Sequence, residues 1–202
     1  MKILNDIRLL DTCIKMKDAI ILGDVHIGYE EAINKTGTFI PRIYFEEMYS
    51  KMEKILKKEK PTKVIINGDL KHEFGRISDQ EWRDTIKFIN LIEKYSKKII
   101  LVEGNHDKII EPIVKHKKVE IKKFVKLNDI FICHGNEIFE EEFKDIKTII
   151  ISHEHPAVTI RDKNRTETFK CFLKGKYKDK ELIVLPSFNT ITAGTDIVRQ
   201  KT

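Results

Sequence analysis

The sequence predicts an α/β fold with helices on the outside and two β-sheets on the inside. Up to residue 151, short apolar runs alternate with segments whose apolar residues keep helical spacing, and after Pro156 only strand-like runs follow. Strand–helix alternation followed by a run of strands is typical of such layered folds. The 202 residues are enough to bury a sizeable core, and we expect one domain over residues 1–202.

The N-terminal part of the chain is expected to contain two short strands, a long loop and a helix. Ile7–Leu10 and Ala19–Leu22 are the predicted strands, joined by a polar turn. Glu30–Ile40 has no clean periodicity and is predicted to be a loop. Pro41 suits the first turn of a helix, and Pro61 is expected to end that helix.

The middle of the chain alternates between strands and helices. Val64–Asn67 and Ile99–Val102 are predicted strands on either side of a helix. Ser78 and Glu81 fit a capping box, which satisfies the first free amides of that helix. Lys108–Val114 is predicted to be a short helix.

The remaining elements begin with a hairpin, in which Phe124–Leu127 and Ile130–Cys133 flank the turn Asn128-Asp129. A short acidic helix is expected at Phe139–Ile146, followed by a strand at Thr148–Ile151. Three later runs are expected to form strands of a meander: Ala157–Ile160, Thr168–Leu173 and Leu182–Leu185.

Five apolar runs end in residue types that bind metal ions. Ile99–Val102, for example, leads into Gly104-Asn105-His106-Asp107, and six of the seven histidines fall in such motifs. Open α/β sheets place their chemistry at the carboxyl ends of strands. The candidate ligands are Asp24, His26, Asp69, Asn105, His134, His153 and His155. Carboxylates and imidazoles converging on two cations ~3.5–4 Å apart indicate a two-metal hydrolase; the alternative is that they are turn and capping residues.

Composition sets further expectations. The net charge of +6 is compatible with a nucleic-acid partner, although a solvated Lys/Glu surface also explains it. No apolar run approaches the ~20 residues of a membrane-spanning helix, and no signal-peptide pattern is seen. Cys13, Cys133 and Cys171 are widely spaced, which predicts a reduced, cytoplasmic protein. Cys133 ends an apolar strand and is expected to be a small buried residue.

The ordered motifs resemble those of the calcineurin-like metallophosphoesterases. That family's pattern is D-x-H, G-D, G-N-H-D/E, H and G-H-x-H. Here the five blocks stand in the same order as Asp24-Val25-His26, Gly68-Asp69, Gly104-Asn105-His106-Asp107, His134 and Ser152-His153-Glu154-His155. The resemblance implies a four-layer αββα sandwich with two mixed β-sheets flanked by helices. Ser152 stands where the family usually has Gly, with little consequence expected.

The resemblance also implies roles for these residues. One metal would be held by Asp24, His26, Asp69 and His155, and the other by Asp69, Asn105, His134 and His153. A metal-bridging hydroxide would attack phosphorus. His106 would protonate the leaving oxygen or stabilise the developing charge, and Asp107 would orient the imidazole of His106. The alternative is that His106 is a purely structural hydrogen-bonding residue. We expect two divalent cations, Mn²⁺ first, with Fe, Zn or Ni also suited to these ligands.

The residues that continue the second motif block, Gly68-Asp69, resemble one branch of this family more than others. Asp69-Leu70-Lys71-His72 is similar to the SbcD-type DNA repair nucleases, in which this histidine assists catalysis. His72 is therefore a catalytic candidate, the alternative being a solvated loop residue. Gly37–Arg42 and Pro186–Asn189 resemble the small SbcD-related phosphoesterases of archaea, relatives of the bacterial DNA-ligase-associated ones. The larger repair nucleases continue into a DNA-capping domain, which we expect this chain to lack.

These observations predict a metal-dependent phosphodiesterase of nuclease type that acts on nucleic acid or nucleotides. A phosphomonoesterase on a small metabolite and a scaffold in a DNA-repair assembly are the alternatives, and a DNA-repair protein partner is compatible with each. Arg42 could clamp a phosphate, but an Arg that follows Pro at a helix start is more often a surface residue. Tyr29 and Phe39 could stack on a base or simply pack at the rim, and Asn189 could lie at the edge of the site.

Overall fold

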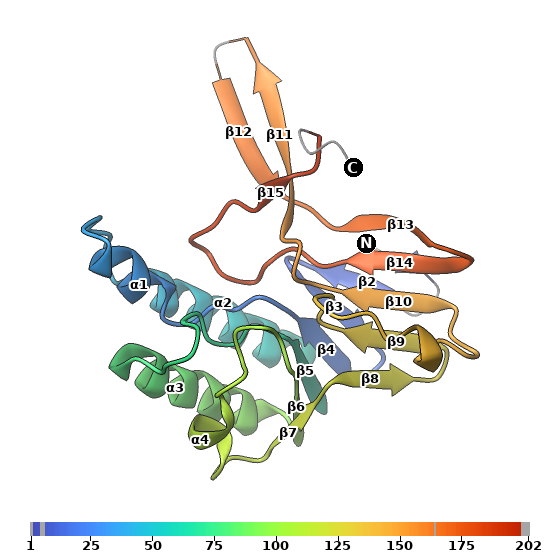
Figure 1. The fold of residues 1–202 in the computed structure, drawn as a ribbon, viewed down its shortest axis with the longest axis horizontal. Helices are drawn as coiled ribbons and strands as arrows, with labels where there is room; N and C mark the ends of the chain where they lie inside the picture. The colour runs from blue at the N-terminus through green and yellow to red at the C-terminus, as the bar shows by residue number, and fades with distance from the viewer. Residues whose placement is uncertain (1, 5–6, 164, 199–202) are drawn as a thin grey trace.

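The centre of the molecule is a pair of mixed β-sheets packed face to face, in a computed structural model that describes residues 2–4, 7–163 and 165–198 (Figure 1). Seven strands form the first sheet, in spatial order β1 Lys2–Leu4, β2 Ile7–Leu10, β3 Cys13–Met16, β4 Ala19–Leu22, β5 Lys63–Asn67, β6 Lys98–Val102 and β7 Val119–Lys122. Neighbours from β1 to β4 pair antiparallel, and neighbours from β4 to β7 pair parallel. The carboxyl ends of β4, β5 and β6 therefore lie at one edge of the sheet.

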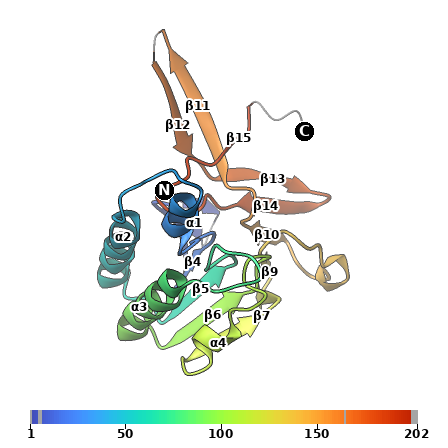
Figure 2. The same ribbon diagram turned by 60° about the vertical axis from the view of Figure 1, so that its left-hand side comes forward.

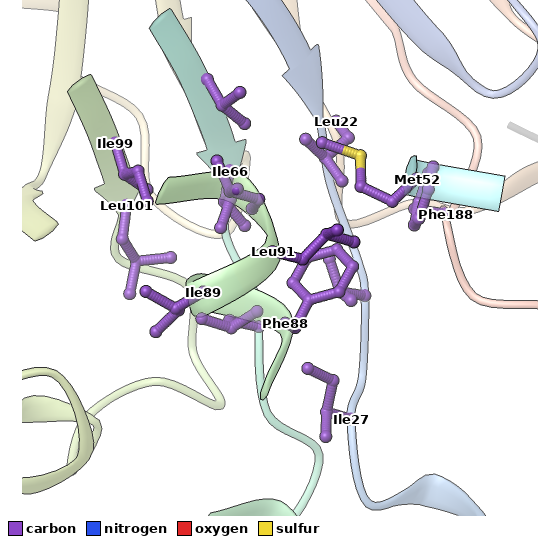
Figure 3. Packing of buried hydrophobic residues seen from close by; sticks show 14 of the residues in the cluster. Leu22, Ile27, Met52, Ile66, Phe88, Ile89, Leu91, Ile99, Leu101 and Phe188 are labelled. Atoms are coloured by element: carbon purple, nitrogen blue, oxygen red, sulfur yellow. The ribbon is translucent and has the colours of Figure 1, made fainter. Parts of the chain in front are cut away.

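Helices cover the outer face of this sheet. They are α1 Tyr29–Lys35, α2 Tyr44–Glu59, α3 Asp79–Tyr95 and α4 Glu111–Val114. Met52 of α2 and Phe88 of α3 are fully buried against Leu22 and Ile66 of the sheet (Figure 3). Burial of a side chain of this size stabilises the fold by about 1.5–3 kcal/mol. The capping box predicted at Ser78 is confirmed at the start of α3.

The second sheet packs on the other face of the first. Its five strands, in spatial order, are β13 Leu173–Tyr177, β14 Lys180–Val184, β10 Thr148–Ile151, β9 Ile130–Cys133 and β8 Phe124–Leu127. Ile21 and Ile65 point into the inter-sheet core, while Ile20 and Val64 point toward the helices. Because both faces of β4 and β5 are buried, these strands are continuous apolar runs in the sequence. The predicted α/β class with two mixed sheets is confirmed.

The layer on the outer face of the second sheet contains less helix than the sequence predicts. The expected acidic helix at 139–146 is reduced to one 3₁₀ turn, Glu140–Glu142, and Phe143 packs from this segment onto Phe131. Asp145 has a φ of 62°, which a continuing α-helix does not allow. A turn and its connecting loop, rather than a helix, therefore cover the outer face of the second sheet.

The predicted meander after Pro156 divides between two sheets. β11 Pro156–Asp162 and β12 Arg165–Lys170 form a hairpin that joins β15 Thr195–Asp196 in a separate sheet and extends away from the body (Figures 1 and 2). Only β13 and β14 join the second main sheet. Both faces of the outer hairpin are largely solvent-exposed, so its residues lack the apolar alternation that would bury one face.

The prediction of a loop at residues 30–40 is wrong in its first half, because α1 occupies Tyr29–Lys35. Glu30 is buried and accepts hydrogen bonds from the backbone N–H of Phe45 (3.0 Å) and from Nε2 of Gln80 (2.9 Å). These tertiary contacts hold a helix that lacks a periodic apolar face. Strands β1 and β3 were also not predicted. Among the described residues, no helix combines the length and apolar character that crossing a bilayer requires.

Candidate metal centre

The seven candidate ligands meet where the strand ends of the two sheets converge. The loops that carry them are joined by backbone hydrogen bonds: the N–H of Asp24 donates to the carbonyl of Gly68 (3.1 Å), and that of Ser152 to the carbonyl of His134 (2.9 Å). The N–H of His153 also donates to the Asp24 carboxylate at 3.2 Å. Residues separated by more than 100 positions in the sequence are thus brought into one cluster.

One set of ligand atoms consists of Asp24, His26 and His155, here called the His26 group. Their donor atoms lie within 4.8 Å of one another. Nε2 of His26 and Nε2 of His155 are 3.3 Å apart, and Nε2 of His155 is 3.3 Å from Oδ1 of Asp24. Asp24 and His26 are buried, and His155 is partly exposed.

The second set consists of Asp69, His134 and His153, here called the His134 group, whose donor atoms also lie within 4.8 Å of one another. Nε2 of His134 is 3.3 Å from Oδ2 of Asp69 and 3.2 Å from Nδ1 of His153. Oδ1 of Asn105 lies 3.1 Å from the same Nε2 and extends this group.

The carboxylate of Asp69 lies between the two groups. Its Oδ2 is 3.3 Å from Nε2 of His134 and 3.8 Å from Nε2 of His26. It is also 3.8 Å from Nε2 of His106. This arrangement places one carboxylate where it could contact two cations.

The spacing of the imidazoles fits metal coordination. Two nitrogens bound at 2.0–2.1 Å to one tetrahedral Zn²⁺ would lie about 3.3 Å apart, and the two facing pairs here are 3.3 and 3.2 Å apart. Nδ1 of His134 lies 3.0 Å from the carbonyl oxygen of Asn67. Because a carbonyl only accepts, Nδ1 carries a proton and Nε2 is the atom aimed at the oxygens of Asp69 and Asn105. A cation at that position satisfies all three atoms.

The electrostatics also favour positive charge at the centre. Burial would raise the pKa of Asp69, but the imidazoles of His134, His26 and His106 outweigh it and hold that pKa well below its ordinary value. Burial lowers the pKa of His26 well below its ordinary value, against the opposing carboxylate of Asp69. A neutral imidazole beside an ionised carboxylate is the donor set that divalent transition metals prefer.

The backbone around the ligands is conformationally unusual. Twelve non-glycine residues in the described part of the chain have positive φ, and five of them are candidate ligands. These five are Asp24 (φ 55°), His26 (48°), Asp69 (52°), His153 (67°) and His155 (46°). Sparsely populated backbone conformations in non-glycine residues cluster at functional sites.

Two glycines make room for the ligands. Gly68 has a φ of 84°, and a Cβ added there would overlap the ring of His134. A Cβ on Gly104 would overlap the carboxylate of Asp69. Both positions therefore exclude larger residues for a steric reason that involves a candidate ligand directly.

His106 faces the centre, but its orientation is fixed differently from the sequence prediction. Its Nδ1 is hydrogen-bonded to the carbonyl of His72, and its backbone N–H donates to Oδ1 of Asp69 (3.0 Å). Asp107 was expected to orient this imidazole. The carboxylate of Asp107 instead accepts backbone N–H bonds from Leu70 (3.0 Å) and Gly104 (3.1 Å), so it shapes the two ligand loops. Burial raises the pKa of Asp107 to about 6, and the charge of Asp69 adds to that effect.

His72 lies beside the His26 group rather than in a solvated loop. Its Nδ1 is 3.4 Å from Nδ1 of His26, and the donor atoms of His26, His72 and His106 also lie within 4.8 Å of one another. By contrast, Arg42 is exposed in the turn before α2 and belongs to none of these groups of donor atoms. Cys133 is buried in the outer cluster of the second sheet, as predicted.

Three residues outside the ligand set support the centre in ways that the sequence did not reveal. Ser152 is fully buried, and its hydroxyl donates to the Asn67 carbonyl that also accepts from His134, so the replacement of Gly has a structural consequence. Asn189 bonds the carbonyl of Asp24 through its Nδ2 at 3.3 Å. Phe74 packs on His106 with ring centroids 3.7 Å apart. The sequence analysis pointed to Ser152 as a departure from the family pattern and to Asn189 as a residue at the edge of the site, whereas it gave no signal for Phe74.

The calcineurin-like phosphoesterase family model matches residues 19–194, which include all seven candidate ligands. The chain belongs to this family. It is therefore a metal-dependent phosphoesterase. No curated protein sequence matches it.

Two solved structures show the same fold as this calcineurin-like phosphoesterase. The nuclease MPE of Pseudomonas putida has a TM-score of 0.72 at 20% identity, with 97% of this chain and 88% of that chain covered. The phosphoesterase YfcE of E. coli has a TM-score of 0.50 at 14% identity, with 88% of this chain and 83% of that chain covered. Both likenesses concern the fold.

Proposed function

We propose that this chain is a dinuclear metal-dependent phosphodiesterase that acts on nucleic acid or nucleotides. The position of the Asp69 carboxylate, between the His26 group and the His134 group, is the observation that carries the proposal. One carboxylate shared by two sets of imidazoles is the arrangement that a two-metal site requires.

The residues divide into two ligand sets around Asp69. Asp24, His26 and His155 would complete the first set, and Asn105, His134 and His153 the second. Two divalent cations bound there would supply a water of lowered pKa and neutralise charge on the phosphate oxygens. Mn²⁺ is the expected metal, and the same donors also suit Fe, Zn or Ni.

His106 is the residue placed to protonate the leaving oxygen. The His72 carbonyl holds its Nδ1, so Nε2 faces the centre, 3.8 Å from Oδ2 of Asp69. His72 lies against both His26 and His106 and would assist this proton transfer by holding their rings.

The substrate class rests on three observations. The second motif resembles that of the SbcD-type nucleases, the net charge is +6, and the chain shares its fold with a bacterial nuclease. We therefore propose a cytoplasmic, archaeal-type, SbcD-related enzyme with a role in DNA repair. A partner protein from a repair assembly is compatible with this role.

Mn²⁺-dependent cleavage of labelled single- and double-stranded DNA and RNA tests the proposal, with the variant His106→Ala as the matched control. Cleavage that the variant loses would support a nuclease and give its strand preference. Rapid hydrolysis of an aryl phosphomonoester, with no action on the corresponding bis-aryl diester, would replace the diesterase by a phosphomonoesterase. If the protein retained no metal after incubation with Mn²⁺, a non-catalytic scaffold would be the better description.

A further inference from the structure

A row of aromatic rings borders the metal centre on the side of His106. Tyr29 stacks on His72 with ring centroids 4.1 Å apart and an interplanar angle of 26°. His72 in turn lies nearly parallel to His106 at 5.4 Å and 26°. Phe74 packs on His106 at 3.7 Å and 34°. The imidazole placed to donate a proton is thus part of an aromatic row that includes Phe74.

The segment that carries Phe74 is firmly held. One carboxylate oxygen of the buried Glu81 accepts from the backbone N–H groups of His72 (2.9 Å) and Glu73 (2.6 Å). The ammonium of the fully buried Lys71 donates to the carbonyls of Glu73 and Arg76, the latter at 3.1 Å. These bonds fix the main chain on both sides of Phe74, and the contact with His106 orients its ring.

Despite its contact with His106, the side chain of Phe74 is 60% exposed. The functional groups of the centre itself are carboxylates, imidazoles and an amide. A phosphate ester bound to such a centre needs no apolar surface for its phosphate group. A large, exposed aromatic ring on a firmly held main chain at the rim therefore suits a flat apolar part of the substrate.

We propose that Phe74 stacks on the nucleobase of the nucleoside whose oxygen leaves during hydrolysis. This inference rests on the proposed phosphodiesterase function. His106 is placed to protonate the leaving oxygen, and Phe74 contacts His106, so Phe74 lies on the leaving-group side of the phosphate. Aromatic side chains bind unpaired bases in a sequence-tolerant manner, since every base has a π face. A base inside a duplex is already stacked, so the site selects single-stranded nucleic acid or a free nucleotide.

The test compares two single-stranded substrates with the same backbone: an oligothymidylate and an oligomer of equal length in which tetrahydrofuran abasic units replace the nucleosides. Hydrolysis is followed with Mn²⁺ present. Phe74→Ala should raise KM for the oligothymidylate on the order of 10-fold and leave the abasic substrate unchanged. Phe74→Trp should keep the preference for bases. The matched control is Phe169→Ala, because Phe169 is 47% exposed, belongs to strand β12 of the outer hairpin and lies outside the aromatic row.

An equal loss of rate on both substrates would show that Phe74 only packs on His106, and an unchanged KM would show that it contacts no base. Either result overturns the inference. A second readout is the change in fluorescence of a 2-aminopurine base in a single-stranded oligomer on binding, which Phe74→Ala should abolish. If the wild-type protein hydrolyses no diester, the proposed function fails, but this binding measurement still decides the role of Phe74.

Discussion

The two ligand groups of the candidate metal centre differ in what holds their imidazoles. In the His134 group, a backbone carbonyl fixes the ring: Nδ1 of His134 bonds to Asn67 at 3.0 Å. In the His26 group, other side chains hold the ring: Nδ1 of His26 is 3.4 Å from Nδ1 of His72, and the rings of His106 and His155 lie 4.8 and 5.1 Å away. Main-chain groups of packed strands are placed by the fold, whereas side chains retain rotamer freedom.

For the proposed two-metal site, this difference predicts unequal metal affinities at the two groups. The His134 group is preorganised before any cation binds, so less conformational entropy is lost when one does. The ring of His26 instead contacts the imidazoles of His72 and His155, whose side chains have to be ordered together with it when a cation binds. We therefore expect the first equivalent of metal to bind at the His134 group. The shared Asp69 then couples the two positions.

Removing the shared carboxylate should have the largest effect. Asp69→Asn takes a negative charge from both groups at once, so we expect hydrolysis of a bis-aryl phosphodiester to fall by more than about 100-fold. Metal content per protein, measured after dialysis, should fall with it. Asp162→Asn in the exposed hairpin is the matched control. Unchanged activity in the Asp69 variant would contradict the two-metal proposal.

Gly68→Ala should damage the His134 group selectively. The added methyl group would overlap the His134 ring, and the backbone there has a φ of 84°. We expect a loss of about 1–3 kcal/mol in the free energy of unfolding and loss of the tighter metal-binding event. Thermal unfolding and calorimetric titration with Mn²⁺ measure the two effects. Gly175→Ala is the control, because a Cβ there meets nothing within 4 Å; equal effects in the two variants would refute the steric argument.

His72→Ala should affect the His26 group and leave the other intact. His72 contacts His26 without belonging to either ligand group, and its ring is partly exposed. We expect about 10-fold weaker binding of the second Mn²⁺ equivalent, with the first unchanged and the melting temperature nearly constant. The same titration measures this. Weakening of the first equivalent instead would reverse the proposed order of affinities.

The sequence alone predicts those elements and candidate site residues that depend on residue type and on spacing along the chain. β8, β9 and β10 were predicted with their observed bounds, because each is a short apolar run between turn residues. The candidate ligands were predicted because several strand ends carry the same residue types. Such regularities are visible without knowledge of tertiary contacts.

The helix that was mispredicted and the residue roles that were not foreseen depend on contacts with residues distant in the sequence. α1 forms although it lacks a periodic apolar face, and its buried Glu30 bonds to Gln80, fifty residues later. Asp107 is adjacent to His106 in sequence, yet its carboxylate bonds to the loop of Leu70. The role of Phe74 depends on the position of its ring against His106, which residue spacing does not give.

The five candidate ligands with positive φ affect which substitutions can stabilise this chain. An L-residue other than glycine in the left-handed region costs roughly 1–2 kcal/mol, so together they approach the whole net stability of a typical domain, about 5–15 kcal/mol. Replacing one of them, such as His153, by Gly would relieve that cost and remove a candidate ligand. Selection for thermal stability alone would therefore favour loss of these candidate ligands, and a thermostable variant that keeps them must gain its stability elsewhere in the fold.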